Sequence, residues 1–435
     1  MRVLAAVTLA SVSLACPVGV VEASIFDLHG FGARGAGVAN ALTAVADDYT
    51  ATYYNPAGLT VRKRAHYGLG VSWILPGLSV DTDLAEPDPA PRPPEMNVGL
   101  HMGVLVPIGG KVGNRLAVGL GIFHPALQFT RVEAFDPARP QFYLYQSLPD
   151  KLLVAPAVAF ELDPRLSIGV GLQILAFLEG TADASVSLEN RRFRRRALSV
   201  DLIGAAAPTA GLLYRPTDTL RIGLCYRKDL DFSYSLPVDL QIEDVGTLVL
   251  DIRGTVLYTP HQLSLGAAQS SADGSTTVMA GLTWAMWSMA PDPSAQVDVV
   301  LHGEDDTEAP PLEVHSAPVD LGADDILISR IGAEHRLSER MTVRGGYSYR
   351  PSPLPLPTGR TNYVDSPAHT GAAGLTWRTG GSGPDEAMPI SWELTAQVTW
   401  LTARRVDKSD PTDSVGSYTA GGPITHLAVS MTHEL

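Results

Sequence analysis

The feature that most constrains this chain is a two-residue alternation of apolar and polar side chains. From Arg165 to Leu178 every even position is apolar, and the odd positions begin Arg165, Ser167, Gly169, Gly171 and Gln173. A β-strand places successive side chains on opposite faces, so this pattern predicts a strand with one apolar face. The same alternation recurs at 115–125, 219–230, 340–350 and 389–403. The sequence therefore predicts an all-β fold.

The alternating segments number fourteen, if 255–269 is one strand bent at Pro260. They are 66–80, 97–106, 115–125, 152–161, 165–178, 199–215, 219–230, 255–269, 276–288, 324–336, 340–350, 368–378, 389–403 and 423–435. The sixth is the least regular, because 205–208 interrupts the alternation. An even number of strands is typical of a bacterial transmembrane barrel.

The connections between these segments are either short or long. Short turns are expected at 162–164, 216–218, 270–274 and 337–339, and long loops at 81–95, 126–150, 179–197, 231–254, 289–321 and 351–367. Outer-membrane barrels have short periplasmic turns and long extracellular loops. A soluble β-sandwich is the alternative, but it has no reason to sort its loops. Trp392 and Trp400 bound one apolar face, as interfacial aromatic girdles do. Because lipid offers backbone groups no hydrogen-bond partner, the sheet must close on itself.

The first 23 residues predict a secretory signal peptide. Arg2 precedes an apolar run, and the small residue Ala23 marks a cleavage point before Ser24. Cys16 raises a lipoprotein alternative, although the preceding leucine is one position away from the usual pattern. After cleavage only Cys225 remains, so we expect no internal disulfide. The net charge of −14 argues against nucleic acid as a partner.

The stretch between the predicted signal and the first strand is rich in glycine. Four glycines fall between Gly30 and Gly37, an Asp47-Asp48 pair follows, and the stretch closes on 55–59. So many glycines disfavour a helix or strand interior, whereas small side chains suit a plug that lies against surrounding walls. A flexible linker is one alternative. A nucleotide-binding loop is another, because Gly30 to Gly35 reads G-x-G-x-x-G, but no strand precedes it.

This glycine-rich pattern resembles the N-terminal hatch of the FadL/TodX family of outer-membrane transporters for hydrophobic compounds. The matching positions are Gly32, Gly35, Gly37, Ala46, Asp47, Asp48, Asn55, Pro56, Ala57, Gly58 and Leu59. The similarity extends over the predicted mature chain and is best at 117–125, 155–173, 210–230 and 343–357. The chain departs from the family at its end, where Leu435 replaces an aromatic residue.

The resemblance implies a transmembrane antiparallel β-barrel of about 14 strands with the hatch in its lumen, in the outer membrane of a Gram-negative bacterium. The implied organisation is a signal peptide at 1–23, a hatch at 24–64 and a barrel at 65–435. The implied function is passive, cofactor-free uptake of hydrophobic small molecules such as long-chain fatty acids or aromatic hydrocarbons. Outer-membrane lipids and the barrel-assembly machinery are the further partners expected.

The family implies three stages of transport, and each carries over to residues of this chain. Capture between the third and fourth long loops would use Phe193, Leu198, Phe232, Tyr234 and Leu236. A pocket at the hatch N-terminus would be lined by Ile25, Phe26 and Leu28. A lateral opening would lie at a kinked third strand that carries Gly119, Gly121 and Pro125, although glycines there also serve ordinary barrel curvature. Phe123 of the same strand is expected to contact the substrate.

Polar residues are expected to anchor the solute in the lumen and the hatch inside the barrel. Arg221, Arg227, Arg344 or Arg350 in the lumen would bind a solute carboxylate bidentately, or else pair with lumen acids such as Glu393. We expect Asp47 and Asp48 to fix the hatch by hydrogen bonds to the barrel wall. We expect Asn55 and Pro56, followed by Ala57, to set the turn into the first strand.

No catalytic or metal-binding constellation is evident in the sequence. The eleven histidines are scattered, without the spacing of metal ligands. The basic run at 191–196 is expected to contact anionic lipid headgroups. A non-transporting surface barrel that binds lipid or acts as an adhesin, and an outer-membrane lipid hydrolase, are the alternative functions.

Overall fold

A computed structural model describes most of the chain. The described residues are 29–109, 113–126, 136–142, 144–145, 152–187, 192–242, 246–292, 294, 296–303, 312–315, 319–357, 361–380, 389–410 and 413–435. Side chains are described for these except at 176–187, 192–204, 232–242, 246–257, 297, 301–303 and 312–315. The predicted signal peptide and the predicted pocket residues Ile25, Phe26 and Leu28 lie outside the described residues.

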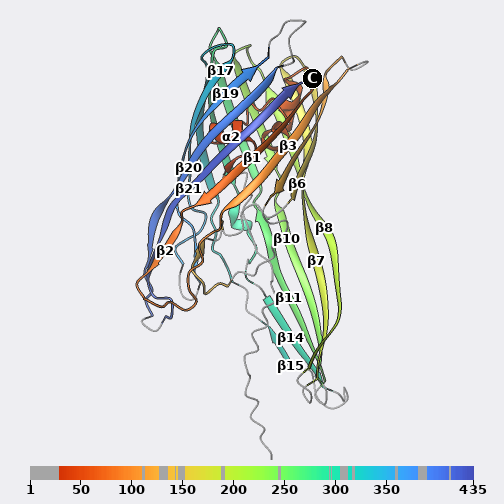
Figure 1. Cartoon of the computed structure of the whole chain (residues 1–435), viewed down its shortest axis with the longest axis vertical. Helices are drawn as coiled ribbons and strands as arrows, with labels where there is room; N and C mark the ends of the chain where they lie inside the picture. The colour runs from red at the N-terminus through yellow and green to blue at the C-terminus, as the bar shows by residue number, and fades with distance from the viewer. Residues whose placement is uncertain are drawn as a thin grey trace, which may run out of the picture.

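Fourteen antiparallel strands form a closed barrel, as the sequence predicts. They are β1 (His66–Pro76), β3 (Asn97–Ile108), β4 (Leu116–Pro125), β6 (Leu152–Asp163), β7 (Leu166–Ser187), β8 (Arg192–Tyr214), β9 (Leu220–Arg227), β12 (Gln262–Ser270), β13 (Thr276–Ala285), β16 (Ile326–Arg336), β17 (Met341–Arg350), β19 (Ala368–Thr379), β20 (Ile390–Val406) and β21 (Tyr418–Glu434). Each strand pairs with the next in this order, and β21 returns to pair with β1 from His66↔Glu434 to Pro76↔Ile424 (Figure 1).

The outer face of the barrel is apolar, as a lipid-facing surface requires. On β20, Trp392, Leu394, Val398 and Trp400 are all exposed, and Trp392 lies opposite the exposed Trp377 of β19. The eight steps along the nine residues from Trp392 to Trp400 cover about 26 Å of the strand, at about 3.3 Å per residue. Even with the strand tilted, this length suits an apolar band with an aromatic residue at each border.

The strand predicted at 255–269 is instead two strands. β11 (Gly246–Thr259) ends before Pro260, and β12 begins at Gln262 as the barrel strand between β9 and β13. Proline lacks the N–H that a ladder needs, so the chain leaves one pairing there and enters another. The barrel count is unchanged because only β12 belongs to the wall.

Three segments expected as long loops, 179–197, 231–254 and 289–321, contain paired strands. β7 and β8 continue as a hairpin through 179–197, and β10 (Leu230–Ile242) pairs with β11 across 231–254. β14 (Gln296–Gly303) joins β11, β15 (Leu312–His315) joins β14, and β10 meets β7 in parallel. These strands form an arm that extends beyond the barrel (Figure 1). The signal is in the sequence, because every even position from Leu230 to Ile242 is apolar.

The remaining short elements lie at the long-loop end of the barrel. β2 (Ser79–Thr82) pairs with the start of β21, and β5 (Gln141–Phe142) pairs in parallel with β18 (Tyr363–Val364). A 3₁₀ turn, η3 (Trp287–Met289), follows β13. Phe142, Leu144, Tyr145 and Tyr418 are fully buried here, so the long loops pack into an apolar cap.

The glycine-rich segment before β1 folds as short helical turns inside the barrel (Figure 1). They are α2 (Ala33–Gly37), α3 (Ala51–Tyr54) and the 3₁₀ turn η1 (Pro56–Thr60). Their residues are almost all buried, with Phe31, Leu42 and Leu59 fully so. Among the described residues, no helix has both the length and the apolar character needed to cross a membrane.

Candidate functional site

The plug, defined here as residues 29–60, packs directly against the strand backbones of the wall. A Cβ added to Gly346 of β17 would lie 2.3 Å from the carbonyl carbon of Val38, and one on Gly223 of β9 would lie 2.2 Å from the oxygen of Thr43. Both distances are far shorter than van der Waals contact. Glycine is therefore required at these wall positions because the plug backbone occupies the place of a side chain.

Gly119 and Gly121 of β4 belong to the same class of wall glycines. A Cβ on Gly119 would lie 2.7 Å from Leu59 Cδ2, and one on Gly121 would lie 2.6 Å from the hydroxyl of Thr52. The registers of β4 with β3 and β6 run without a shift through both glycines. In this conformation these glycines seat the plug, and the strand is not interrupted at either of them.

The other predicted residues of this strand lie at its far end. Pro125 is the last residue of β4 and lies opposite Gly99 of β3. Phe123 is buried, and its ring covers Gly99, where an added Cβ would lie 2.2 Å from ring atoms. The β4 to β6 pairing ends at Phe123↔Leu153.

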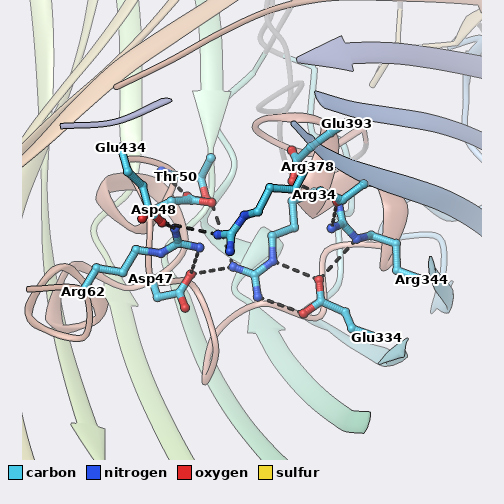
Figure 2. A network of polar contacts seen from close by, with 11 residues as sticks. Arg34, Asp47, Asp48, Thr50, Arg62, Glu334, Arg344, Arg378, Glu393 and Glu434 are labelled. Atoms are coloured by element: carbon cyan, nitrogen blue, oxygen red, sulfur yellow. Dashed lines mark hydrogen bonds and ion pairs between the residues drawn. The ribbon is translucent and has the colours of Figure 1, made fainter. Parts of the chain in front are cut away.

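An ionic network ties the plug to the wall through Arg34 (Figure 2). Arg34 Nε and Nη2 donate to the two carboxylate oxygens of Glu334 on β16, both at 2.9 Å, and Nη1 donates to Asp47 Oδ1 at 2.6 Å. Arg344 of β17 pairs with Glu334 and with Glu393 of β20, both at 3.2 Å. Arg34 of the plug is thus bound to Glu334 of β16, and through Glu334 and Arg344 it is linked to β17 and β20.

Asp47 and Asp48 were expected to form hydrogen bonds to the barrel wall, but the structure pairs them with other residues. Their bonds among the described residues go to neighbours before β1 and not to the wall: Asp47 pairs with Arg34 and with Arg62 at 3.4 Å, and Asp48 accepts from Thr50 N at 2.8 Å. Burial alone would raise the pKa of Asp47, but Arg62 and Arg34 outweigh it and hold the pKa well below its usual range. Asp47 therefore stays ionised and orients Arg34, the residue that sequence reasoning missed.

The closing turn of the plug is set by Asn55. Its side chain accepts from Ala57 N at 3.1 Å, which caps η1, and Pro56 occupies the first position of that turn. Its amide also donates to Thr43 O at 2.9 Å and to Leu212 O of β8 at 3.1 Å. This one side chain holds the turn, the plug and the wall together.

The plug glycines Gly32, Gly35 and Gly37 are also fixed by contact or conformation. Gly32 has φ of 82°, in the left-handed region. A Cβ on Gly35 would lie 2.0 Å from Tyr54 Oη, and one on Gly37 would lie 2.8 Å from Arg344 Cδ. These glycines let the plug fold tightly on itself and approach β17.

The short-turn end of the barrel holds a charged vestibule, a cavity of about 760 Å³. Its charged lining residues are Arg34, Arg62, Arg336, Arg340, Arg344 and Arg378 together with Asp48, Glu334, Glu339, Glu393 and Glu434. Such a lining is hydrated, because burying these charges without water would be costly. The vestibule therefore offers no favourable environment to an apolar solute.

Three buried histidines lie where the plug begins. His29, His101 of β3 and His426 of β21 are each at most 2% exposed, and the rings of His29 and His426 are 5.7 Å apart. Within the described residues, neither ring nitrogen of His29 or of His426 has a hydrogen-bond partner. No group of three or more potential metal ligands was found in the part of the chain that the structure describes. Sequence reasoning treated the histidines as scattered and missed this cluster.

Two of the predicted arginine anchors already have protein partners. Arg350 donates to both oxygens of Asp365 at 2.9 and 2.8 Å and to Tyr145 Oη at 2.7 Å. Arg227 donates to Tyr53 Oη and Tyr53 O, each at 3.0 Å, and lies 4.1 Å from the centre of that ring. A solute carboxylate would have to displace these groups.

The predicted capture residues lie in the arm. Phe193 and Leu198 are in β8, and Phe232, Tyr234 and Leu236 are in β10. Their side chains are outside those described. The parallel contact of β10 with β7 brings the two hairpins side by side.

The chain is similar in sequence and in fold to known outer-membrane proteins. The pattern of the family described as "Outer membrane protein transport protein (OMPP1/FadL/TodX)" matches residues 14–382. Alkane uptake protein A of Marinobacter nauticus is 24% identical over 449 residues, covering 98% of this chain and 95% of that protein.

Solved structures with a similar fold include a FadL homologue of Pseudomonas aeruginosa, with TM-score 0.60, 14% identity, and coverage of 96% of this chain and 100% of that one. The toluene transporter TodX of P. putida has TM-score 0.57, 15% identity, and coverage of 94% and 99%. The toluene transporter TbuX of Ralstonia pickettii has TM-score 0.53, 16% identity, and coverage of 94% and 100%.

Proposed function

The chain belongs to the OMPP1/FadL/TodX family of outer membrane transport proteins, and on that premise we propose that it takes up hydrophobic small molecules passively and without a cofactor. It is an outer-membrane barrel, and its family is one of transporters of hydrophobic compounds rather than of enzymes. The proposed solutes are alkanes, aromatic hydrocarbons or long-chain fatty acids, as the relatives' names suggest.

This proposal depends on one observation: the plug and the charged vestibule block a straight route for an apolar solute along the barrel axis. The plug fills the bore, and beyond it lies the charged vestibule. An apolar solute that entered from the long-loop end would lose its apolar surroundings at the vestibule, at about 25 cal/mol per Å² of apolar surface returned to water. A route that ends in the membrane avoids this cost, which favours sideways exit through the wall.

We place the lateral opening beside Gly119 and Gly121. In the present conformation Thr52, Leu59 and Phe31 cover these two glycines. If the plug withdrew from β4, the wall there would carry no inward side chain, because neither glycine has one. Motion of the plug would then uncover a thin part of the wall next to the lipid.

The pocket before this opening is proposed at the start of the plug. Ile25, Phe26 and Leu28 supply apolar side chains immediately before His29, and His29 lies against His426. The five predicted arm residues, Phe193 to Leu236, remain the proposed place of first capture. We assign no solute contact to Arg227 or Arg350, because protein groups occupy both guanidinium ions.

Deleting residues 24–28 tests this function. Cells that carry the full-length protein should take up labelled toluene or oleate in a saturable manner, and the deletion should reduce uptake at least tenfold. Heat-modifiable mobility on gels should be unchanged, since the deleted residues precede the packed plug. Unchanged uptake by the deletion variant would contradict the pocket, and absence of saturable uptake by the intact protein would favour a non-transporting surface barrel.

A further inference from the structure

The pairing of β6 with β7 is interrupted in the middle of the barrel wall. Its pairs run to Val154↔Ile174 and resume at Ala157↔Gly171 in the same register, so two pairs between them are missing. The neighbouring pairings, β4 with β6 and β7 with β8, continue through this level without a gap. We call the interrupted stretch the seam, and its residues are Ala155, Pro156, Leu172 and Gln173.

Pro156 accounts for the interruption. Proline has no N–H, so it removes a donor from the ladder of hydrogen bonds. The N–H and C=O of one residue point to the same neighbouring strand. The carbonyl oxygen of Pro156 lies on the β7 side, 3.0 Å from the position of a Cβ on Gly171, so the missing N–H belongs to the pairing with β7. Pro208 of β8 lies on the other side of β7, opposite Leu172, where the pairing is complete.

The plug supports β7 only on the short-turn side of the seam. A Cβ on Gly169 would lie 2.5 Å from Ala57 N of the plug, whereas the nearest atoms to a Cβ on Gly171, the next inward position, all belong to the wall. β7 begins at the short-turn end and runs toward the long loops, so the seam lies on the long-loop side of this contact. A solute that entered from the long-loop end would therefore reach the seam before it met the plug at Gly169.

Small side chains line the lumen side of the seam. Ala155 lies opposite Gly121 of β4, so it continues the thin part of the wall proposed above. Ala155 and Ala157 are both buried, whereas Val158 and Leu172 are exposed on the outer, lipid-facing side. Parting of β6 from β7 here would connect the lumen with the hydrocarbon of the membrane and would displace no large inward side chain of β6.

Two buried polar side chains beside the seam have no hydrogen-bond partner for one of their atoms among the residues that the structure describes. These atoms are Gln173 Nε2 and Thr209 Oγ1, and the two residues are 5% and 3% exposed. A buried donor without a partner destabilises the closed wall. Parting of the strands would leave carbonyl groups of β6 without partners, and lipid offers them none. Gln173 and Thr209 supply donors for these groups, so both side chains favour the parted state.

We propose that solutes leave the lumen sideways between β6 and β7, where the seam parts at Pro156. This inference rests on the proposed function and locates the exit more finely, at the strand pair next to Gly119 and Gly121. It assigns Pro156 a role in transport that ordinary barrel curvature does not require.

Restoring the missing donor tests this exit. Pro156→Ala adds an N–H at the seam and should reduce saturable uptake of labelled toluene or oleate by cells about fivefold, the effect of one added backbone hydrogen bond. Pro208→Ala is the matched control, because it makes the same change on the other side of Leu172, where the pairing is already complete, and it should leave uptake unchanged. Equal uptake by wild type and Pro156→Ala would overturn the proposal.

A reversible disulfide across the seam is the second test. Ala155→Cys with Gln173→Cys, in a Cys225→Ala background, places two thiols at facing positions, where side chains lie close enough for a disulfide. Oxidation should abolish saturable uptake, and reduction should restore it to the level of the reduced variant. Ala267→Cys with Ala280→Cys is the control, since these residues face each other in the complete pairing of β12 with β13, and its oxidation should have no effect. Continued uptake by the oxidised seam variant would refute an exit here.

Hydrogen exchange separates failure of this inference from failure of the proposed function. In the detergent-solubilised full-length protein, the amides of residues 171–174 should exchange about fivefold more slowly in Pro156→Ala than in wild type. Equal exchange would overturn the seam. Saturable uptake that neither Pro156→Ala nor the disulfide changes would remove the seam alone. Slower exchange in Pro156→Ala together with no saturable uptake by wild type would remove the proposed function and support a seam that parts.

Discussion

Gly346→Ala is the change that tests most directly whether the plug is pressed against the wall. Gly346 lies on β17 between Gly332 of β16 and Ala372 of β19, and its backbone does not require glycine, because its φ is not in the left-handed region. The added methyl carbon would lie 2.3 Å from the carbonyl carbon of Val38, whereas ordinary contact begins at 3.4 Å. Strand or plug must therefore move by roughly 1 Å.

Neither Gly346 of the wall nor Val38 of the plug can move freely. Gly346 is in register with a strand on each side, and Val38 is held by hydrogen bonds to Gly35 O and from Ala41 N, both 3.2 Å long. Overpacking usually costs about 1–3 kcal/mol, and such a constrained contact belongs at the upper end. A loss of about 3 kcal/mol corresponds to about a hundredfold increase in the population of undocked plug.

Amide hydrogen exchange of residues 35–45 in the detergent-solubilised protein measures this population. We expect their exchange to become about a hundredfold faster in Gly346→Ala, while the barrel strands remain protected. Gly371→Ala on β19 is the control, because nothing lies within 4 Å of an added Cβ there. This variant should be neutral or slightly more stable, since alanine restricts the unfolded chain. A less than threefold change in Gly346→Ala would refute the packing argument.

Three other predictions concern the charged contacts. Arg34→Met should raise chymotrypsin cleavage at the plug tyrosines, because it removes the charge that joins Asp47 of the plug to Glu334 of the wall, at a cost of about 3 kcal/mol. Arg340→Met, in the same vestibule, should leave this cleavage unchanged. Because the pKa of Asp47 is depressed in the folded protein, its contribution to stability is present above the unfolded pKa and is lost as pH falls through the folded one. The decrease in melting temperature caused by Asp47→Asn, relative to wild type at the same pH, should therefore stay constant from pH 8 to about pH 4 and become smaller only in stronger acid; a decrease that becomes smaller between pH 7 and 5 would contradict this. The comparison with wild type removes the shared contribution of His29, whose pKa is lowered by burial. Asp365→Asn should lower the melting temperature of the loop cap, with a loss of about 3 kcal/mol, because Arg350 would remain buried without a counter-charge; unchanged thermal unfolding would show that the pair contributes little.

In the arm, the alternation of side chains indicates strands, but the prediction of loops there was wrong. The alternation from Leu230 to Ile242 is as regular as that of any wall strand, yet these residues were expected to form a loop. Periodicity identifies a strand but not its partner. Pairing of β10 with β11 and β7 is a non-local choice, and the sequence alone does not distinguish it from insertion into the barrel wall.

The glycines of the wall show a different limit. Gly119, Gly223 and Gly346 look alike in the sequence and are consistent with curvature, bending or a gate. Their common role becomes visible only when Leu59, Thr43 and Val38 are found opposite them. A missing side chain carries no information about what takes its place.

Short-range periodicity and composition predict the all-β class, the fourteen strands of the wall and the glycine-rich segment before them, and closure of the sheet follows from the lack of hydrogen-bond partners in lipid. The sequence by itself did not determine which charge holds the plug, since Arg34 and Glu334 are 300 residues apart and meet only across the bore. It also did not reveal the histidine cluster, whose members His29 and His426 come from opposite ends of the chain. These features depend on which distant segments the closure of the sheet brings together, and that was decided by the tertiary structure.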